Sequence, residues 1–180
     1  ILPVILILIC LFATFKYHIR FNENRKFHEL NYVNFESFSF AKEIDEKFLG
    51  LKWITPEYKN ETQKEISHIN QIKLHLYKDS RKKMLLTNYS FFSAILNEKL
   101  FSPTRWHIFD GTDYPLTGNK YFINYKNLLI KLIEENNIKI IYTTYPVESS
   151  ILYKYLDRHC LEEVKISNIL NSYEIKNCYK

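Results

Sequence analysis

The segment RWHIFDGTDYP, from Arg105 to Pro115, gathers the residue types in this chain that are best suited to chemistry. Its two carboxylates, Asp110 and Asp113, flank a glycine and a threonine. A phosphatase with an aspartate nucleophile carries that residue two positions before a second acid, and Ile108 occupies the corresponding position here. Two carboxylates alone also supply too few hard ligands for a divalent metal. We therefore interpret this segment as a structured loop whose side-chain oxygens satisfy nearby backbone donors.

Arg105 and Trp106 are a second feature of the same segment. A guanidinium group beside an indole ring could bind a carboxylate or the phosphate of an anionic lipid. The alternative is that Trp106 packs beneath the loop, as large aromatic side chains commonly do. Both residues stay candidates for binding a negatively charged group.

Polar residues also follow the apolar runs that are predicted to be strands. Asn88 ends KMLLTN, Thr144 lies near the end of KIIYTTYP, and Thr55 ends LKWIT. Ligands of open α/β sheets bind beyond the carboxyl ends of the strands, so we expect these side chains to line a crevice there. Ser90 lacks the flanking glycines of a nucleophilic serine at a sharp turn, and is predicted to cap the next helix instead.

Alternating apolar patterns predict the elements that would position these residues. Strands are expected at the three apolar runs, with a further extended segment at 164–175, and helices at 41–49, 57–77, 91–100, 121–136 and 149–160. Asn137 should end the fourth of these helices. Strands that alternate with helices imply right-handed crossovers and parallel pairing. The expected fold class is α/β, a small parallel three-layer sheet domain that follows the end of an N-terminal transmembrane helix.

The composition fits one folded domain and excludes two classes of site. The chain has 180 residues, of which 46% are hydrophobic and 25% charged, as in globular proteins. Its 3 glycines are widely separated, so neither a phosphate-binding loop nor a dinucleotide fingerprint can be formed. The formal net charge is +5, but the lysines are interleaved with glutamates, so no nucleic-acid partner is expected.

The N-terminal residues predict contact with a membrane. No charged residue occurs from Ile1 to Phe15, and Lys16, His18 and Arg20 follow at once. Fifteen helical residues span roughly 22 Å, which is less than a hydrocarbon core of about 30 Å. We expect residues 1–16 to be the end of a transmembrane helix of a longer protein, 17–40 an interfacial connector and 41–180 a soluble α/β domain. The alternative is a buried core helix of a soluble enzyme.

The cysteines and the basic residues give opposite indications of the membrane side. Cys10 lies in the apolar helix, which leaves Cys160 and Cys178 as a possible disulfide. A disulfide would place the domain on an oxidising face. The basic residues just past the helix favour the cytoplasm instead: Lys16, Arg20, Arg25 and Lys26. These residues alone leave the side open.

Several phrases of the sequence carry a family resemblance. A hydrophobic helix leads into RFNENRKFHEL, and LKWITPEYK, FSPTRWHIFDGTDYP, GNKYF and EIKNC follow. Together they resemble the C-terminal region of bacterial polytopic glycosyltransferases of the GT-C, dolichyl-phosphate-mannose mannosyltransferase-like superfamily. The resemblance implies an inverting membrane enzyme that transfers a sugar from a polyprenyl-phosphate donor on the extracytoplasmic (periplasmic) side. The extracytoplasmic side that it implies agrees with a disulfide between Cys160 and Cys178 and disagrees with the indication from the basic residues.

The resemblance carries no catalytic residue onto this chain. In that superfamily the catalytic acid lies in the first extracytoplasmic loop, between early membrane helices, and nothing here matches that motif. The expected partners are upstream transmembrane helices of the same protein, a lipid-linked sugar donor and membrane lipid. We expect the chain alone to be inactive and to hold no cofactor, while a divalent metal in the whole protein is left open.

The residues and the resemblance together give one set of binding candidates and two other hypotheses. The candidate substrate-binding residues are Asn88, Arg105, Trp106, Asp110, Asp113 and Thr144. The main alternative to a transferase domain is a membrane-anchored, non-catalytic module that binds or assembles envelope glycans. The third hypothesis is the soluble α/β enzyme named above.

Overall fold

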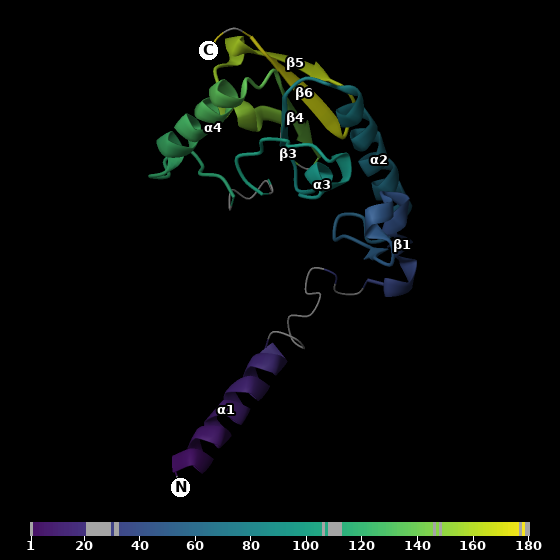
Figure 1. Ribbon diagram of the computed structural model, residues 1–180, viewed down its shortest axis with the longest axis vertical. Helices are drawn as coiled ribbons and strands as arrows, with labels where there is room; N and C mark the ends of the chain where they lie inside the picture. The colour runs from purple at the N-terminus through teal and green to yellow at the C-terminus, as the bar shows by residue number, and fades with distance from the viewer. Residues whose placement is uncertain are drawn as a thin grey trace. The chain divides into compact units, whose positions relative to one another are not determined.

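The computed structural model describes residues 2–20, 30, 33–105, 107, 113–145, 147, 149–176 and 178 (Figure 1). The chain forms two compact units, Ile1–Ile66 and Ser67–Lys180. Two of the candidate residues, Trp106 and Asp110, lie outside the described residues.

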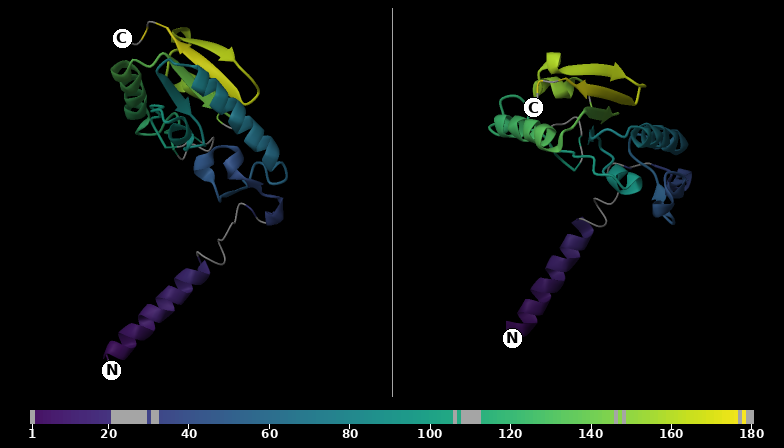
Figure 2. Two further views of the ribbon diagram at one scale, coloured as in Figure 1. Left: turned by 45° about the vertical axis from the view of Figure 1, so that its right-hand side comes forward. Right: turned by 45° about the horizontal axis from the view of Figure 1, so that its top comes forward.

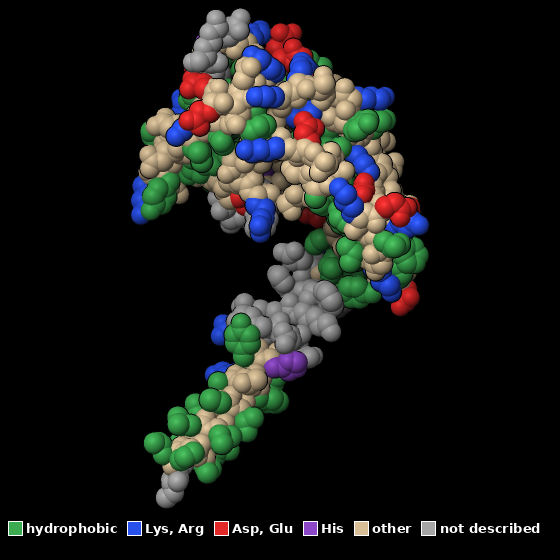
Figure 3. Space-filling model, viewed as in Figure 1, with side chains coloured by type: hydrophobic (Ala, Val, Ile, Leu, Met, Phe, Trp, Pro, Cys, Tyr) green, Lys and Arg blue, Asp and Glu red, His purple; other side chains and the backbone are tan. Residues whose placement is uncertain are grey.

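Apolar side chains cover most of the face of helix α1 (Leu2–His18) that Figure 3 shows. All its residues are exposed, and Leu11, Phe12 and Phe15 are 62%, 66% and 63% exposed. Its only basic residues, Lys16 and His18, lie in the last turn. In the described part of the chain, no helix combines the length and the apolar character needed to cross a membrane.

The rest of the first unit is built from short elements. Its strands β1 (Ser39–Phe40) and β2 (Lys52–Trp53) pair antiparallel. The helix predicted for residues 41–49 is wrong, because the structure has two separate 3-10 turns, η4 (Ala41–Glu43) and η5 (Glu46–Phe48). Asp45 separates them: its backbone is extended, at φ −164° and ψ 144°, and its carboxylate accepts the Lys47 amide proton at 3.2 Å. A third turn, η3 (Phe35–Ser37), precedes β1.

Within the first unit, the buried carboxylate of Glu65 links the first turns of helix α2 (Thr62–Lys78) to the segment that contains β2. Trp53 Nε1 and Thr55 Oγ1 both donate to Glu65 Oε2, each at 2.8 Å. A buried charge is tolerated only when donors satisfy it, and these two bonds do so. Thr55 is therefore a structural residue of this unit rather than part of a crevice at the end of a larger sheet.

The second unit contains a mixed four-stranded sheet in the order β3-β4-β6-β5 (Figures 1 and 2). Strands β3 (Lys83–Leu86) and β4 (Ile140–Thr144) are parallel, as expected. The expectation of a wholly parallel sheet is wrong, because β6 (Leu170–Ile175) pairs antiparallel with both β4 and β5 (Leu161–Lys165). Residues 166–169 join β5 to β6, and a connection this short cannot make the crossover that parallel pairing requires.

The helices of the second unit differ in how well the pattern predicted them. Helix α4 (Phe122–Asn136) confirms the prediction, and Asn137 ends it in a left-handed conformation with φ 52°. Helix α3 (Phe92–Leu96) is much shorter than expected because Asn97 is also left-handed. Its N-cap is Phe91, so the predicted cap at Ser90 is wrong. The helix predicted for 149–160 is instead two 3-10 turns, η6 (Ser149–Lys154) and η7 (Arg158–Cys160).

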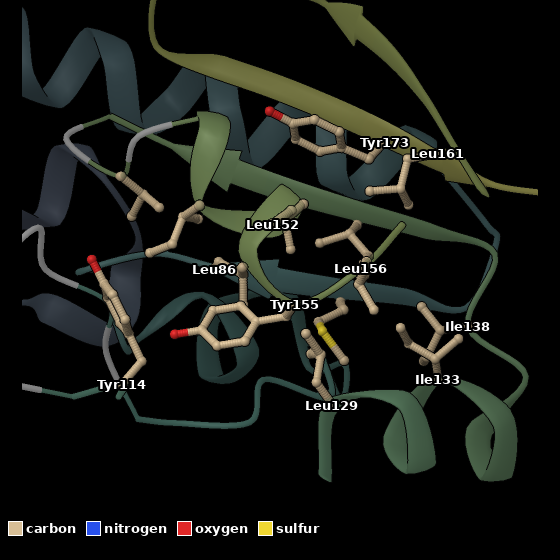
Figure 4. Packing of buried hydrophobic residues seen from close by; sticks show 14 residues of the cluster. Leu86, Tyr114, Leu129, Ile133, Ile138, Leu152, Tyr155, Leu156, Leu161 and Tyr173 are labelled. Atoms are coloured by element: carbon tan, nitrogen blue, oxygen red, sulfur yellow. The ribbon is translucent and has the colours of Figure 1, made fainter. Parts of the chain in front are cut away.

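One face of the sheet packs against α4 and η6 (Figure 4). The sheet contributes Met84 and Leu86 of β3, Ile141 of β4 and Tyr173 of β6 to this cluster. They face Leu129 and Ile133 of α4, Leu152 of η6 and Tyr155 just after η6, which are 3% exposed or less. Because side chains alternate along a strand, Tyr142 points to the other face. There its hydroxyl donates to Asp79, just past the end of α2, at 2.6 Å.

A disulfide joins Cys160, just before β5, to Cys178, beyond β6, with a Cα–Cα distance of 5.6 Å. It therefore closes the open end of the β5–β6 hairpin. Cys10 in α1 is free and exposed.

Replacing both bridged cysteines by alanine should lower the free energy of unfolding by about 3 kcal/mol. This is the loop-closure entropy expected for the observed sequence separation of 18 residues. Urea unfolding in detergent measures the change, and Cys10→Ala is the matched control that should leave the midpoint unchanged. An unaltered midpoint in the double variant would show that the bridge contributes nothing to stability.

Candidate functional site

The outer edge of β3 positions the candidate site. β3 is an edge strand, and such a strand leaves backbone donors and acceptors unpaired unless another segment covers them. Here the Leu85 amide donates to the Leu100 carbonyl at 3.1 Å, and the His107 amide donates to the Thr87 carbonyl at 2.7 Å. The chain after α3 is thus bonded to β3 at two points.

These two bonds force the chain between them to leave the sheet. Leu85 of β3 and Thr87, the residue after the strand, are two positions apart, whereas Leu100 and His107 are seven positions apart. Not all of the intervening residues can follow the strand, and the described ones, 101–105, form a projecting loop. A cleft with a volume of about 410 Å³ lies between this loop, the end of β3 and the turn into α3.

The wall of the cleft carries positive charge, hydroxyl groups and aromatic rings. Lys99 and Arg105 are exposed on it, and Tyr89 and Phe101 contribute partly buried rings. The Lys99 ammonium lies 4.7 Å from the centre of the Phe101 ring. Such a combination can bind an anion through the cations and a flat apolar surface through the rings.

Two threonines form the support beneath the cleft. Thr144 donates its hydroxyl proton to Thr87 Oγ1 at 2.7 Å, and the Tyr89 amide donates to the same oxygen at 3.0 Å. Thr144 is fully buried, so it holds Thr87 and the turn to Tyr89 in place rather than contacting a ligand. Asn88, next to Thr87, has a buried Oδ1 with no hydrogen-bond partner among the described residues.

A buried histidine holds the far end of the projecting loop. His107 is 2% exposed, its Nδ1 lies 2.8 Å from Thr104 Oγ1, and its Nε2 lies 3.1 Å from the Tyr125 hydroxyl of α4. Its ring stacks on Tyr114 with centres 5.3 Å apart. Burial lowers the pKa of His107 to about 4, although the carboxylate of Asp113 acts in the opposite direction. The imidazole is therefore neutral at neutral pH and serves as a hydrogen-bonding support.

Two tyrosines extend this support. Burial raises the pKa of Tyr125 well above its ordinary value, and burial also raises the pKa of Tyr155 to about 12. Both phenols therefore keep their protons at neutral pH. Tyr155 donates its proton to the Pro115 carbonyl at 2.6 Å, which fixes the chain just before α4.

The structure brings together only part of the predicted set. Arg105 lines the cleft, Thr144 lies beneath it, and Asn88 belongs to the turn between two lining residues. Asp113 acts electrostatically on the buried His107 instead of lining the cleft.

Sequence reasoning missed His107, Thr104 and Tyr125. The one available signal was a histidine flanked by Trp106 and Ile108, since apolar neighbours indicate a buried segment. The pairing with Tyr125 crosses 18 positions of the chain, and no local pattern reports it.

The comparisons with known proteins give no relative: no family model, no curated protein and no solved structure matches the chain.

The stability of the chain should depend on pH through His107. Its pKa is about 4 when folded and 6.5 as an ordinary histidine, so between these values the unfolded state binds a proton that the folded state does not. The free energy of unfolding should therefore fall as pH falls through this window, by about 3 kcal/mol in total. Above the pH window, His107 is neutral in both states, so its titration no longer lowers the free energy of unfolding.

Urea unfolding at a series of pH values tests this with two variants. His107→Gln should remove this part of the pH dependence, while His75→Gln, at an exposed histidine of α2, should keep it. Parallel curves for the wild type and His107→Gln between about pH 7 and about pH 4 would contradict a neutral buried imidazole.

Proposed function

We propose that the chain is the C-terminal part of a membrane glycosyltransferase of the GT-C type, which transfers a sugar from a polyprenyl-phosphate donor. The observation that carries the proposal is α1, a helix whose apolar side chains are exposed all around its surface. Water does not tolerate a continuous apolar surface of this extent, but the hydrocarbon of a bilayer does. In the proposed protein α1 is the end of a transmembrane helix that packs with further helices of the same protein.

The disulfide supports an extracytoplasmic position for the second unit. Disulfides persist in oxidising compartments and are rare where thiols are kept reduced. The Cys160–Cys178 bridge joins the ends of a hairpin that is already paired along β5 and β6, so it belongs to the folded state. In the proposal this evidence outweighs the basic residues Lys16, in the last turn of α1, and Arg20, just after it, and the domain lies on the periplasmic side.

The chemistry of the cleft supports binding rather than catalysis by this domain. Inverting glycosyl transfer requires a general base, and a carboxylate usually supplies it. None of the described residues that line the cleft is a carboxylate, whereas Lys99 and Arg105 are both present. We therefore assign the catalytic carboxylate to a part of the protein outside this chain. We assign the recognition of the substrate, next to the active site, to the α/β domain. That domain has three layers in the proposal, with helices on both faces of the sheet.

The same cleft chemistry also favours a second candidate. A wall whose described residues include cations and rings but no carboxylate suits a membrane-anchored module that binds envelope glycans without turning them over. The two candidates differ in whether the whole protein has transferase activity.

A transfer assay on the whole protein, purified with its membrane helices, tests the proposal. Polyprenyl-phosphate sugars of several kinds serve as donors, and the release of polyprenyl phosphate is measured. We expect turnover by the whole protein and none by the 180-residue chain, which should nevertheless sediment with membranes. Turnover by this chain alone would contradict catalysis elsewhere, and whole protein without turnover on any lipid-linked donor would favour the non-catalytic module.

A further inference from the structure

The size of the cleft beside β3 sets the class of ligand that it can hold. Its volume of about 410 Å³ lies within the range of about 300–1,000 Å³ that is typical of small-molecule sites. One or two sugar rings fit such a space. A polyprenyl chain requires a long apolar groove, and the hydroxyls of Ser90 and Ser102 make this wall unsuitable for one.

The charges around the cleft favour a negatively charged ligand. Lys99 and Arg105 place two cationic groups on its wall, and none of the lining residues that the structure describes is an acid. The acid that precedes Lys99 in sequence, Glu98, already forms an ion pair at 2.6 Å with Lys83, whose side chain is 1% exposed. Because Glu98 compensates the buried Lys83, its charge is not available to neutralise Lys99.

The rings give the cleft a second, apolar mode of contact. Phe101 and Tyr89 both line it and both keep part of their surface accessible. The C–H face of a pyranose is apolar and packs on such rings, while its hydroxyls need partners like those of Ser90 and Ser102. The ammonium group of Lys99, 4.7 Å from the Phe101 ring centre, brings the charge and the apolar surface next to each other.

The backbone holds this arrangement before any ligand binds. Phe101 has φ 45°, which is a left-handed conformation that is strained for a bulky residue. The bonds of Leu100 and His107 to β3 hold the loop on either side, and Ser102 donates to the Thr104 carbonyl at 2.6 Å within it. Strain that the surrounding structure maintains is characteristic of binding sites, and a preformed site loses less entropy when it binds.

We propose that this cleft binds an anionic saccharide, one whose ring carries a phosphate or a carboxylate group. The sugar ring packs on Phe101 and Tyr89, and the anionic group binds Lys99 and Arg105. The proposal rests on the function given above, in which it makes the α/β domain the recognition site for a charged sugar substrate.

Calorimetric titration of the 180-residue chain in detergent micelles tests the inference. The probes are glucose 6-phosphate and glucuronic acid, with glucose and inorganic phosphate as the neutral and sugar-free comparisons. We expect both anionic sugars to bind at least about tenfold more tightly than either comparison, because only they use the cations and the rings together. Equal affinity for inorganic phosphate would overturn the role of the rings, and equal affinity for glucose would overturn that of the cations.

Variants separate the two contributions. Lys99→Gln and Arg105→Gln should each weaken the anionic sugars about tenfold and leave glucose unchanged. Phe101→Leu should weaken all three sugars, since it removes the ring while retaining an apolar side chain. Lys154→Gln, an exposed lysine outside the cleft, is the matched control and should bind like the wild type. Urea unfolding of each variant confirms that the fold is intact. Wild-type affinity in both cation variants would overturn the assignment.

The outcome is distinguishable from that of the transfer assay. Transferase activity of the whole protein without any binding of anionic sugars here would retain the proposed function and remove this inference. Binding without transferase activity would retain the cleft as an anionic-sugar site, and would remove its place in a glycosyltransferase.

Discussion

An edge strand leaves alternate backbone amides and carbonyls directed at solvent, and in this protein the way that β3 is covered determines the shape of the candidate site. The Leu85 amide and the Thr87 carbonyl receive partners from one later segment, and the two partners lie farther apart in sequence than two residues of a strand allow. The extra residues between Leu100 and His107 must therefore project away from the sheet. Arg105 and the strained Phe101 belong to that projection, and the cleft lies beside it.

The same constraint explains why a histidine is buried at a site with no catalytic use for it. His107 fixes the C-terminal end of the projecting loop. Its amide donates to the Thr87 carbonyl, and its ring contacts Thr104 and Tyr125. Burial keeps the imidazole neutral, so it can bond without bringing an uncompensated charge into the core. Electrostatics therefore supports the geometry of the loop, and the charges that face the cleft come from other residues.

Local patterns predicted part of this fold, for identifiable reasons. Strands β3 and β4 and helix α4 followed from apolar runs, an amphipathic stripe and the terminating Asn137, all of which are encoded within one element. The antiparallel β5–β6 hairpin was missed because pairing direction depends on the length of a connection rather than on composition. Helices were expected at 41–49 and 149–160, where the apolar spacing is also compatible with 3-10 turns.

The candidate site was predicted less completely than the fold. Arg105 was identified from the sequence because a guanidinium group next to an aromatic residue suggests binding of a negatively charged group. The cleft itself arises from hydrogen bonds between β3 and residues well beyond it in sequence, and such contacts leave no periodic signal. Lys99 was not singled out, because in the sequence it is one of many lysines interleaved with glutamates; its place on the wall depends on where the chain leaves the strand.

Hydrogen exchange of single amides measures the attachment of the loop most directly. In the intact chain, the amides of Leu85 and His107 should exchange as slowly as those in the middle of β4, because both donate to the backbone across the β3 edge. The amide of the exposed Ser102, in the projecting part, should exchange much faster. If His107 exchanged as fast as Ser102, the loop would not be fastened beside β3, and the account of the cleft would be contradicted.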